Sequence, residues 1–236
     1  MTNSRYKNIL ILGAMECEIA LFKNRTDLHI IKTGVGERSV NKCIQKKIIP
    51  ILKNHKIDCA INVGFAGSLA RDVKKLTLIL PNKITHQATK KSISIDSALW
   101  LPFVEKISPL QSKKYNIGGH LLCADQILNR EDKKKLSAMD EKYTYVDMES
   151  YWIGQFMQER GIPFVVIRCI LDDYNFQFPP LKFLRAQWPL ALWKEALVHF
   201  LFHPVELINL HLLRIYEKKA ACENSMAVSL FLESMT

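Results

Sequence analysis

The sequence predicts an α/β fold in which helices cover both faces of a mostly parallel or mixed sheet. Short apolar runs that end in turn residues or acids are typical of buried strands. They alternate with segments whose apolar residues recur at helical spacing. The 236 residues, 48% of them hydrophobic, suit one large domain better than two small ones.

Six apolar runs are the predicted strands: residues 8–13, 28–32, 58–63, 76–80, 118–123 and 164–171. Gly64 is expected to end the third strand, and residues 83–115 are expected to form loops and short elements. The last run, FVVIRCIL, has the strongest strand character and is predicted to be a central strand.

Three helices are predicted between these strands. Residues 37–53 carry one apolar stripe, formed by Val40, Cys43, Ile44, Ile48 and Ile51. Pro50 is expected to weaken the last turn of that helix. Asn129 suits the N-cap of a charged helix, and residues 149–160 form the third helical pattern.

The C-terminal part of the chain has a different character. Residues 1–180 are predicted to form the main α/β domain, and residues 181–236 a helical extension packed on it. This tail is rich in Leu, Phe and Trp, with helical spacing in two pieces broken at Pro204. One interpretation is a pair of helices that close the core. The other is an apolar surface for a lipid-like substrate or a membrane interface.

Composition narrows the choice of partners. The net charge of +10 has three interpretations: solubility, an anionic substrate or an anionic membrane surface. Nucleic acid is not expected, because aromatic residues do not interleave with the lysine clusters. The six cysteines lack C-x-x-C pairs and metal-ligand spacing, so we expect reduced thiols, no metal and no cofactor. We recognise neither a signal peptide nor a charge-free stretch of about 20 residues, which predicts a cytoplasmic protein.

Four segments at predicted strand ends could carry chemistry. They are residues 13–18 (GAMECE), 62–68 (NVGFAGS), 146–150 (VDMES) and the pair Asp172-Asp173. Acids that follow an apolar strand are costly to bury unless they cap a helix or act on a ligand. Small residues such as those of 62–68 let the backbone approach a ligand closely. Capping remains an alternative interpretation for each acid.

Taken together, the motifs GAMECE, TGVG, INVGFAG, VDMES and VIRCILDD resemble those of one family. This family comprises the methylthioadenosine/S-adenosylhomocysteine nucleosidases and the wider nucleoside phosphorylases, and the resemblance covers about residues 8–175. It implies a three-layer α/β/α sandwich with a mixed central sheet, and a homodimer or larger oligomer. The tail, with Pro179-Pro180 and the break at Pro204, is similar to the hopanoid-associated phosphorylase branch. That branch acts on an adenosyl group joined to a long hydrocarbon.

The resemblance also implies roles for individual residues. Glu18 is expected to activate the attacking water, and Asp172 to protonate the purine at N7 as the base leaves. Glu149 is expected to hold the ribose hydroxyls, with Met148 packed on the sugar. The other expected substrate-binding residues are Phe65, Ala66 and Gly67 in the glycine loop, and Ile127 and Leu128 beside the adenine edge.

The chemistry explains why these residue types are needed. Breaking an N-glycosidic bond leaves positive charge on the ribose and negative charge on the base. A carboxyl that protonates the base and a carboxylate beside the sugar stabilise these two charges. Asp172 must then be protonated before reaction, while Glu18 stays ionised or shares a proton.

The chain departs from the family pattern at several positions. Phe65 stands where a small polar residue is usual, Leu171 replaces the Ser before the expected catalytic Asp, and Lys74-Lys75 replaces a Gly-Asp pair. Arg38 and Arg71 are candidates for binding phosphate, although an exposed structural role suits both.

We therefore predict a purine nucleosidase that acts on an adenine nucleoside, either methylthioadenosine-like or lipid-linked. The presence of Glu18 favours hydrolysis over phosphorolysis with inorganic phosphate. The alternatives are a nucleoside phosphorylase of the hopanoid-associated type and a non-catalytic descendant that binds a nucleoside or a membrane. Peripheral membrane contact is expected only if the tail binds lipid.

Overall fold

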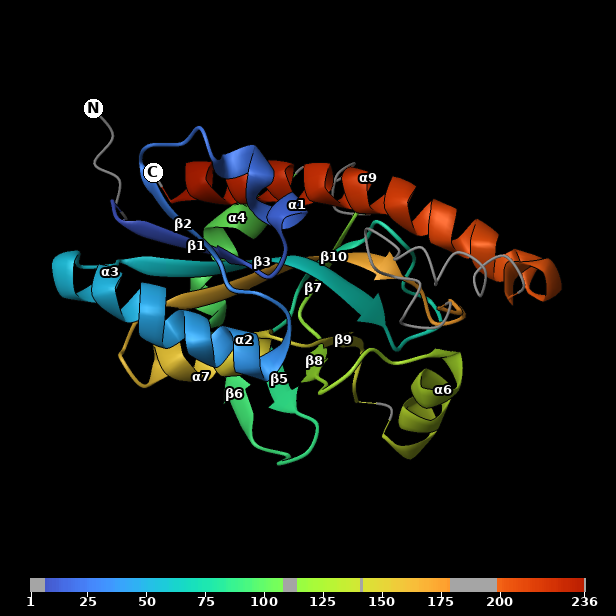
Figure 1. Cartoon of the computed structure of the whole chain (residues 1–236). Coiled ribbons are helices and arrows are strands. Elements are labelled where there is room, and N and C mark those ends of the chain that lie inside the picture. The colour runs from blue at the N-terminus through green and yellow to red at the C-terminus, as the bar shows by residue number, and fades with distance from the viewer. Residues whose placement is uncertain (1–6, 108–113, 141, 179–198, 236) are drawn as a thin grey trace.

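A computed structural model describes residues 7–107, 114–140, 142–178 and 199–235. These residues form a ten-stranded mixed sheet between two layers of helices, so the predicted three-layer α/β fold is confirmed (Figure 1). The strand order is β6-β5-β8-β9-β3-β10-β4-β7, with β1 beside β3 and β2 beside β1. The strands are β1 Ile9–Gly13, β2 Leu28–Lys32, β3 Cys59–Ser68, β4 Leu78–Leu80, β5 Lys83–His86, β6 Ser92–Ser94, β7 Tyr115–Ile117, β8 His120–Cys123, β9 Tyr145–Asp147 and β10 Phe164–Asp172.

Helices cover the two faces of the sheet in separate groups. One group contains α1, α4 and α9, and the other contains α2, α3 and α7 (Figure 1). The α-helices are α1 Glu16–Ile19, α2 Gly36–Cys43, α3 Ile49–Asn54, α4 Leu101–Lys106, α6 Arg130–Met139, α7 Ser150–Gln158 and α9 Pro204–Ser234. Short 3₁₀ turns lie at Ala20–Phe22 and Ser97–Leu99. All six cysteines are free, as the sequence predicts.

Strands β3 and β10 form the centre of the sheet. They pair in parallel from Phe164 opposite Ala60 to Asp172 opposite Gly67, and every residue of β3 is buried. The expectation that this strand ends at Gly64 is wrong. Because β10 on one side and β9 on the other supply hydrogen-bond partners beyond Gly64, the strand continues to Ser68.

The helix predicted over residues 37–53 consists of α2, a wider π-helical turn at Ile44–Ile48, and α3. Pro50 lies in the first turn of α3 rather than weakening the last turn of one helix. Proline has no N–H to donate and its ring clashes with the carbonyl four residues earlier, so the helix widens just before it. Asn129 caps α6 as predicted, accepting hydrogen bonds from the N–H groups of Glu131 and Asp132.

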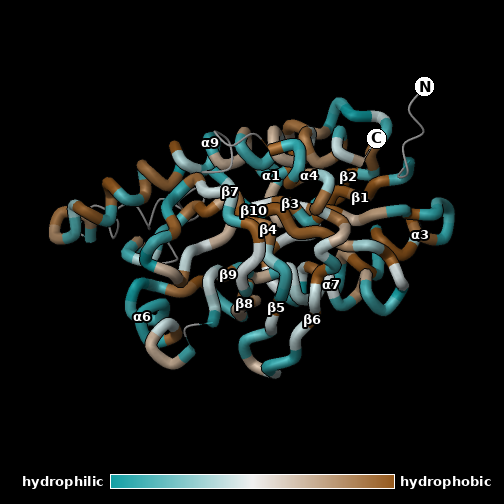
Figure 2. Tube along the Cα trace, turned by 180° about the vertical axis from the view of Figure 1, so that it is seen from behind, coloured by the Kyte–Doolittle hydropathy of each residue, from teal (hydrophilic) through white to brown (hydrophobic). Residues whose placement is uncertain are grey.

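Helix α9 begins at Pro204, where the sequence predicts a break, and runs for 31 residues. Its C-terminal half packs on the sheet through residues that include the fully buried Ala227, Val228 and Phe231. Its N-terminal half extends beyond the strands and carries exposed apolar residues (Figure 2). Among the described helices, none is both long enough and apolar enough to cross a membrane.

Replacing Phe231 by alanine is expected to destabilise the protein by about 3–5 kcal/mol, because the side chain is fully buried and leaves a cavity. The free energy of unfolding should be measured by urea denaturation. Met226→Ala on the same helix is the matched control, since Met226 is 53% exposed, and it should change stability by about 0.5 kcal/mol or less. Equal losses in the two variants would contradict the packing of α9 on the sheet.

Candidate active site

The predicted acids lie at the edge of the sheet where the parallel strands β1, β3 and β10 end. Glu18 follows β1 in α1, and Asp172 is the last residue of β10. Glu149 lies two residues after the end of β9 and is the N-cap of α7. Ligands of open α/β sheets bind at the carboxyl ends of the strands, so this edge is where a site is expected.

The carboxylate of Glu18 joins α1 to the end of β3. Its Oε2 accepts a hydrogen bond from the N–H of Met15 (2.8 Å), and its Oε1 accepts one from the N–H of Phe65 (3.1 Å). The first bond is half of a capping box, which fixes the start of the short helix. Burial raises the pKa of Glu18, and the charge of Arg168 opposes that shift.

A fully buried arginine, Arg168, lies at the centre of the acidic residues. Its Nη2 is 2.8 Å from Oδ2 of Asp147, 3.7 Å from Oε2 of Glu149 and 3.1 Å from Oγ of Ser150. Its Nε and Nη1 have no hydrogen-bond partner among the described residues. These two groups are therefore buried donors that the described residues leave unpaired.

Glu149 is held by backbone as well as by Arg168. Its Oε1 accepts a hydrogen bond from the N–H of Gly36, 3.0 Å away in the first turn of α2. Burial raises its pKa to about 7, Arg168 works against this shift, and the nearby carboxylates of Asp147 and Glu18 add to it. Three buried acids, Glu18, Asp147 and Glu149, therefore share one buried cation.

Asp172 reaches the site because the strand is irregular there. The register of β10 against β3 shifts between Ile170 and Asp172, so Asp172 rather than Leu171 lies opposite Gly67. A Cβ on Gly67 would lie 2.6 Å from Oδ2 of Asp172, so only glycine leaves room for the carboxyl. Lys133 of α6 forms an ion pair with this carboxyl. Burial raises the pKa of Asp172, and Lys133 opposes that shift.

Glu18 and Asp172 are separated by a short length of β3. Oε1 of Glu18 bonds to Phe65, and Asp172 lies against Gly67. Phe65 and Gly67 are two residues apart in the strand, or roughly 7 Å, so the two carboxyl groups lie within reach of one small ligand. A Cβ on Gly64 would lie 2.5 Å from Oε1 of Glu18, so this glycine also makes room for a carboxylate.

The remaining predicted site residues are placed around this edge. The side chain of Phe65 packs into the core, so it is its N–H that faces Glu18. Met148 is half-buried, and its methyl carbon would be 3.9 Å from a Cβ on Gly36. Ala66 lies beside Gly67 in β3. In the loop between β8 and α6, Ile127 is 37% exposed and Leu128 is buried.

Two functional candidates were missed by the sequence reasoning, Arg168 and Lys133. Arg168 interrupts an otherwise apolar buried strand, and this signal could have identified it, because an unpaired charge cannot remain in a core. Lys133 is one of three consecutive lysines and carries no such signal. The proposed phosphate ligands Arg38 and Arg71 are exposed, and Arg71 lies over the ring of Tyr174 at 5.5 Å.

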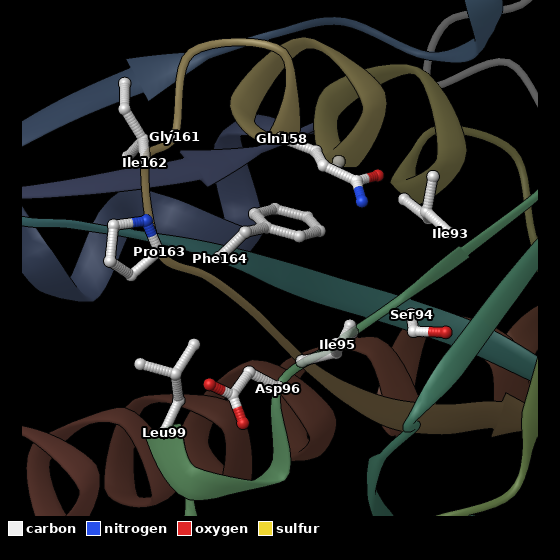
Figure 3. A pocket seen from close by; sticks show the side chains of 11 residues that line it. Ile93, Ser94, Ile95, Asp96, Leu99, Gln158, Gly161, Ile162, Pro163 and Phe164 are labelled. Atoms are coloured by element: carbon white, nitrogen blue, oxygen red, sulfur yellow. The ribbon is translucent and has the colours of Figure 1, made fainter.

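A pocket of about 260 Å³ lies at the opposite end of β10 (Figure 3). It is lined by residues of β6, α7 and the start of β10, among them Ile93, Gln158 and Phe164. Phe164 is eight residues before Asp172 in the same strand, or roughly 26 Å away along it. This pocket is therefore separate from the acidic site.

Comparison with known proteins agrees with this architecture. Residues 16–179 match the family model of the phosphorylase superfamily. The 5'-methylthioadenosine/S-adenosylhomocysteine nucleosidase of Haemophilus influenzae (strain PittGG) is 27% identical over 195 residues, which cover 69% of this chain and 84% of that protein. The enzyme of the same name from Staphylococcus aureus (strain MRSA252) is 22% identical over 200 residues, covering 70% and 86%.

Solved structures of similar fold bear related names. A 5'-methylthioadenosine/S-adenosylhomocysteine nucleosidase from Colwellia psychrerythraea 34H, in complex with adenine, has a TM-score of 0.71 at 18% identity, covering 98% of this chain and 96% of that one. The nucleosidase from S. pneumoniae, with the transition-state inhibitor MT-ImmA, has a TM-score of 0.70 at 14% identity, covering 97% and 100%. The predicted enzyme class, an N-glycosyl hydrolase or pentosyltransferase, is confirmed at this level. The chain belongs to the phosphorylase superfamily.

Glu149→Gln is expected to change how stability depends on pH. Because the pKa of Glu149 is raised from 4.5 to about 7, the folded protein binds more protons than the unfolded chain between these values. Stability contributed by this group is therefore present at low pH and lost as the pH rises toward 7. The Tm of the wild type relative to that of E149Q should fall between about pH 5 and 7 and level off above about pH 8.

The exposed Glu159 provides the control, because it lies at the other end of α7. For Glu159→Gln, the difference in Tm from the wild type should stay nearly constant over the same range. A constant difference for E149Q as well would contradict the raised pKa.

Proposed function

We propose that this chain hydrolyses the N-glycosidic bond of an adenine nucleoside. The observation that supports the proposal best is the placement of Glu18, Glu149 and Asp172 at one edge of the sheet, with Arg168 between the first two. The similarity of the chain to methylthioadenosine/S-adenosylhomocysteine nucleosidases supports adenine as the base of the substrate. The 5' substituent is either a small thioether or a lipid.

The arrangement of acids supplies each step of the hydrolysis. As the bond between C1' and N9 breaks, its electron pair goes to the base, and Asp172 gives a proton to N7. The positive charge that develops on the ribose is stabilised by nearby carboxylates. A water held near Glu18 adds its oxygen to C1', and its proton goes to Glu18. Glu149 binds the ribose hydroxyls, and the products are adenine and the free sugar.

The charges around Arg168 favour water over phosphate as the acceptor. Its guanidinium already lies beside Asp147 and Glu149. The carboxylate of Glu18 occupies the N–H of Phe65, where an anion would otherwise be bound. Phosphate would meet three carboxyl groups there, whereas a neutral water meets no such repulsion.

We also infer that the N-terminal end of α9 binds an anionic membrane surface. Apolar side chains are exposed around this end, which projects past the sheet (Figure 2): Leu201, Phe202, Val205, Leu207 and Ile208. The chain carries a net charge of +10, which complements anionic lipid. Asn209 donates a hydrogen bond to the carbonyl of Gln177 (3.1 Å), so this end lies beside the segment that follows Asp172. A lipid-linked nucleoside could then reach the acids from the membrane.

The hydrolysis is tested by measuring adenine release from methylthioadenosine and adenosine, with and without phosphate. Asp172→Asn and Glu18→Gln are each expected to lower kcat by roughly 10²–10⁴-fold, because each removes a proton-transfer group. Asp173→Asn is the matched control and should stay within a few-fold of the wild type. Release that requires phosphate would identify a phosphorylase, and nucleoside binding without release would identify a non-catalytic descendant. Variants as active as the wild type would overturn the proposal.

Membrane binding is tested by sedimentation with vesicles. The wild type is expected to bind phosphatidylserine vesicles and not phosphatidylcholine vesicles. The double variant Phe202→Glu, Val205→Glu should lose that binding, because both side chains are exposed on the projecting end. Met139→Glu is the control, since Met139 is 82% exposed on α6, and it should bind as the wild type does. If the wild type sediments with neither kind of vesicle, the inference is wrong.

A further inference from the structure

Lys133 is the one lysine of α6 that is fully buried. The two lysines that follow it, Lys134 and Lys135, are exposed. Asn129 fixes the start of the helix by accepting hydrogen bonds from two N–H groups, and Lys133 lies one turn beyond it. The position of Lys133 is therefore set by a rigid, capped helix rather than by a mobile loop.

The ammonium group of Lys133 is directed entirely at the end of β10. Its Nζ pairs with Oδ2 of Asp172, donates to the carbonyl of Asp173 (2.9 Å), and lies 3.4 Å from the carbonyl of Asp172. An ammonium has three N–H donors, so these contacts account for all of them. Among the described residues, Lys133 therefore contacts two backbone carbonyls and one side chain, and that side chain is the carboxyl of Asp172.

The ion pair with Lys133 and the burial of Asp172 affect the protonation of its carboxyl in opposite directions. Asp172 must hold a proton at the moment the base leaves, yet a neighbouring ammonium favours the ionised carboxylate before reaction. Burial acts in the opposite direction and favours the neutral carboxyl. A buried pair of this kind holds one acidic proton that either group can carry, because a neutral amine beside a neutral carboxyl avoids the cost of burying two charges.

We propose that Lys133 is a positioning residue that orients the carboxyl of Asp172 and supplies the proton that this carboxyl delivers to the base. Lys133 begins as an ammonium beside the carboxylate. As the bond between C1' and N9 breaks, a proton passes from Nζ to the carboxyl, and a proton of the carboxyl passes to N7. The departing base is then neutral, Asp172 is again a carboxylate, and Lys133 is an amine. Solvent returns the proton to Lys133 after the products leave.

Other charges near Asp172 do not replace this role. Among the described residues, Asp173 and Lys75 are two further charged groups that act on it. Nζ of Lys75 lies 3.6 Å from Oδ2 of Asp173, so these two largely neutralise each other. Both are partly exposed, whereas Lys133 and Asp172 are buried. The acidic proton of the site therefore belongs to the pair formed by Lys133 and Asp172.

The test compares Lys133→Arg, Lys133→Met and the exposed control Lys134→Met. For each, kcat and KM for adenine release are measured from pH 5 to 9, together with Tm. Arginine keeps a cation beside Asp172 but does not give up its proton, so K133R should lower kcat by about 100-fold with KM changed by less than about threefold. In K133M the charge that lowers the pKa of Asp172 is gone, so this carboxyl keeps its proton to higher pH, and the decline of kcat at high pH should begin at least about one pH unit higher. K134M should match the wild type.

The possible outcomes separate this proposal from the proposed function on which it rests. If D172N is as active as the wild type, the nucleosidase mechanism itself fails. If D172N is inactive while K133R keeps kcat within about threefold, only the role of Lys133 is overturned. If K133M lowers kcat by the same factor at every pH, Lys133 has a purely structural role, and the proposal for Lys133 is also overturned. Should K133R not fold, as judged by Tm, the pH profile of K133M decides.

Discussion

The buried positive charge of Arg168 is the constraint on which the site depends. Arg168 lies in the central strand β10, where its guanidinium is fully buried. A buried cation is tolerated only beside carboxylates that are themselves hydrogen-bonded. Asp147 and Glu149 meet this need from the end of β9 and the start of α7, and Glu18 lies close by in α1. One charge in the core thus gathers three acids from two distant parts of the chain.

Two glycines and one irregularity in a strand make room for these acids. Gly64 and Gly67 leave space for the carboxyls of Glu18 and Asp172, which a Cβ would displace. The bulge near Leu171 brings Asp172 opposite Gly67. The same edge then holds acids in different surroundings, one beside a backbone N–H and one beside a lysine. Different surroundings are what allow similar carboxyl groups to take different roles in proton transfer.

Much of the fold was predictable because its strands are short apolar runs with clear ends. The central position of β10, the cap at Asn129 and the break at Pro204 all follow from local sequence. The end of β3 did not, because Gly64 is a turn signal locally and a ladder residue once β9 and β10 flank it. The helix around Pro50 also differs from the prediction. The proline does not weaken its last turn, because the helix widens into a π-helical turn before Pro50 and then continues.

By itself, the sequence determined the residue types of the site: acids and glycines at the ends of apolar strands, in an order similar to that of one family. Only the tertiary structure decided which charges meet. Lys133 and Asp172 are 39 residues apart, and in the sequence Lys133 is indistinguishable from Lys134 and Lys135. Its pairing with Asp172 depends on how α6 packs against the end of β10. Ion pairing depends on distance and burial, and for residues far apart in the chain both are fixed only when the chain has folded.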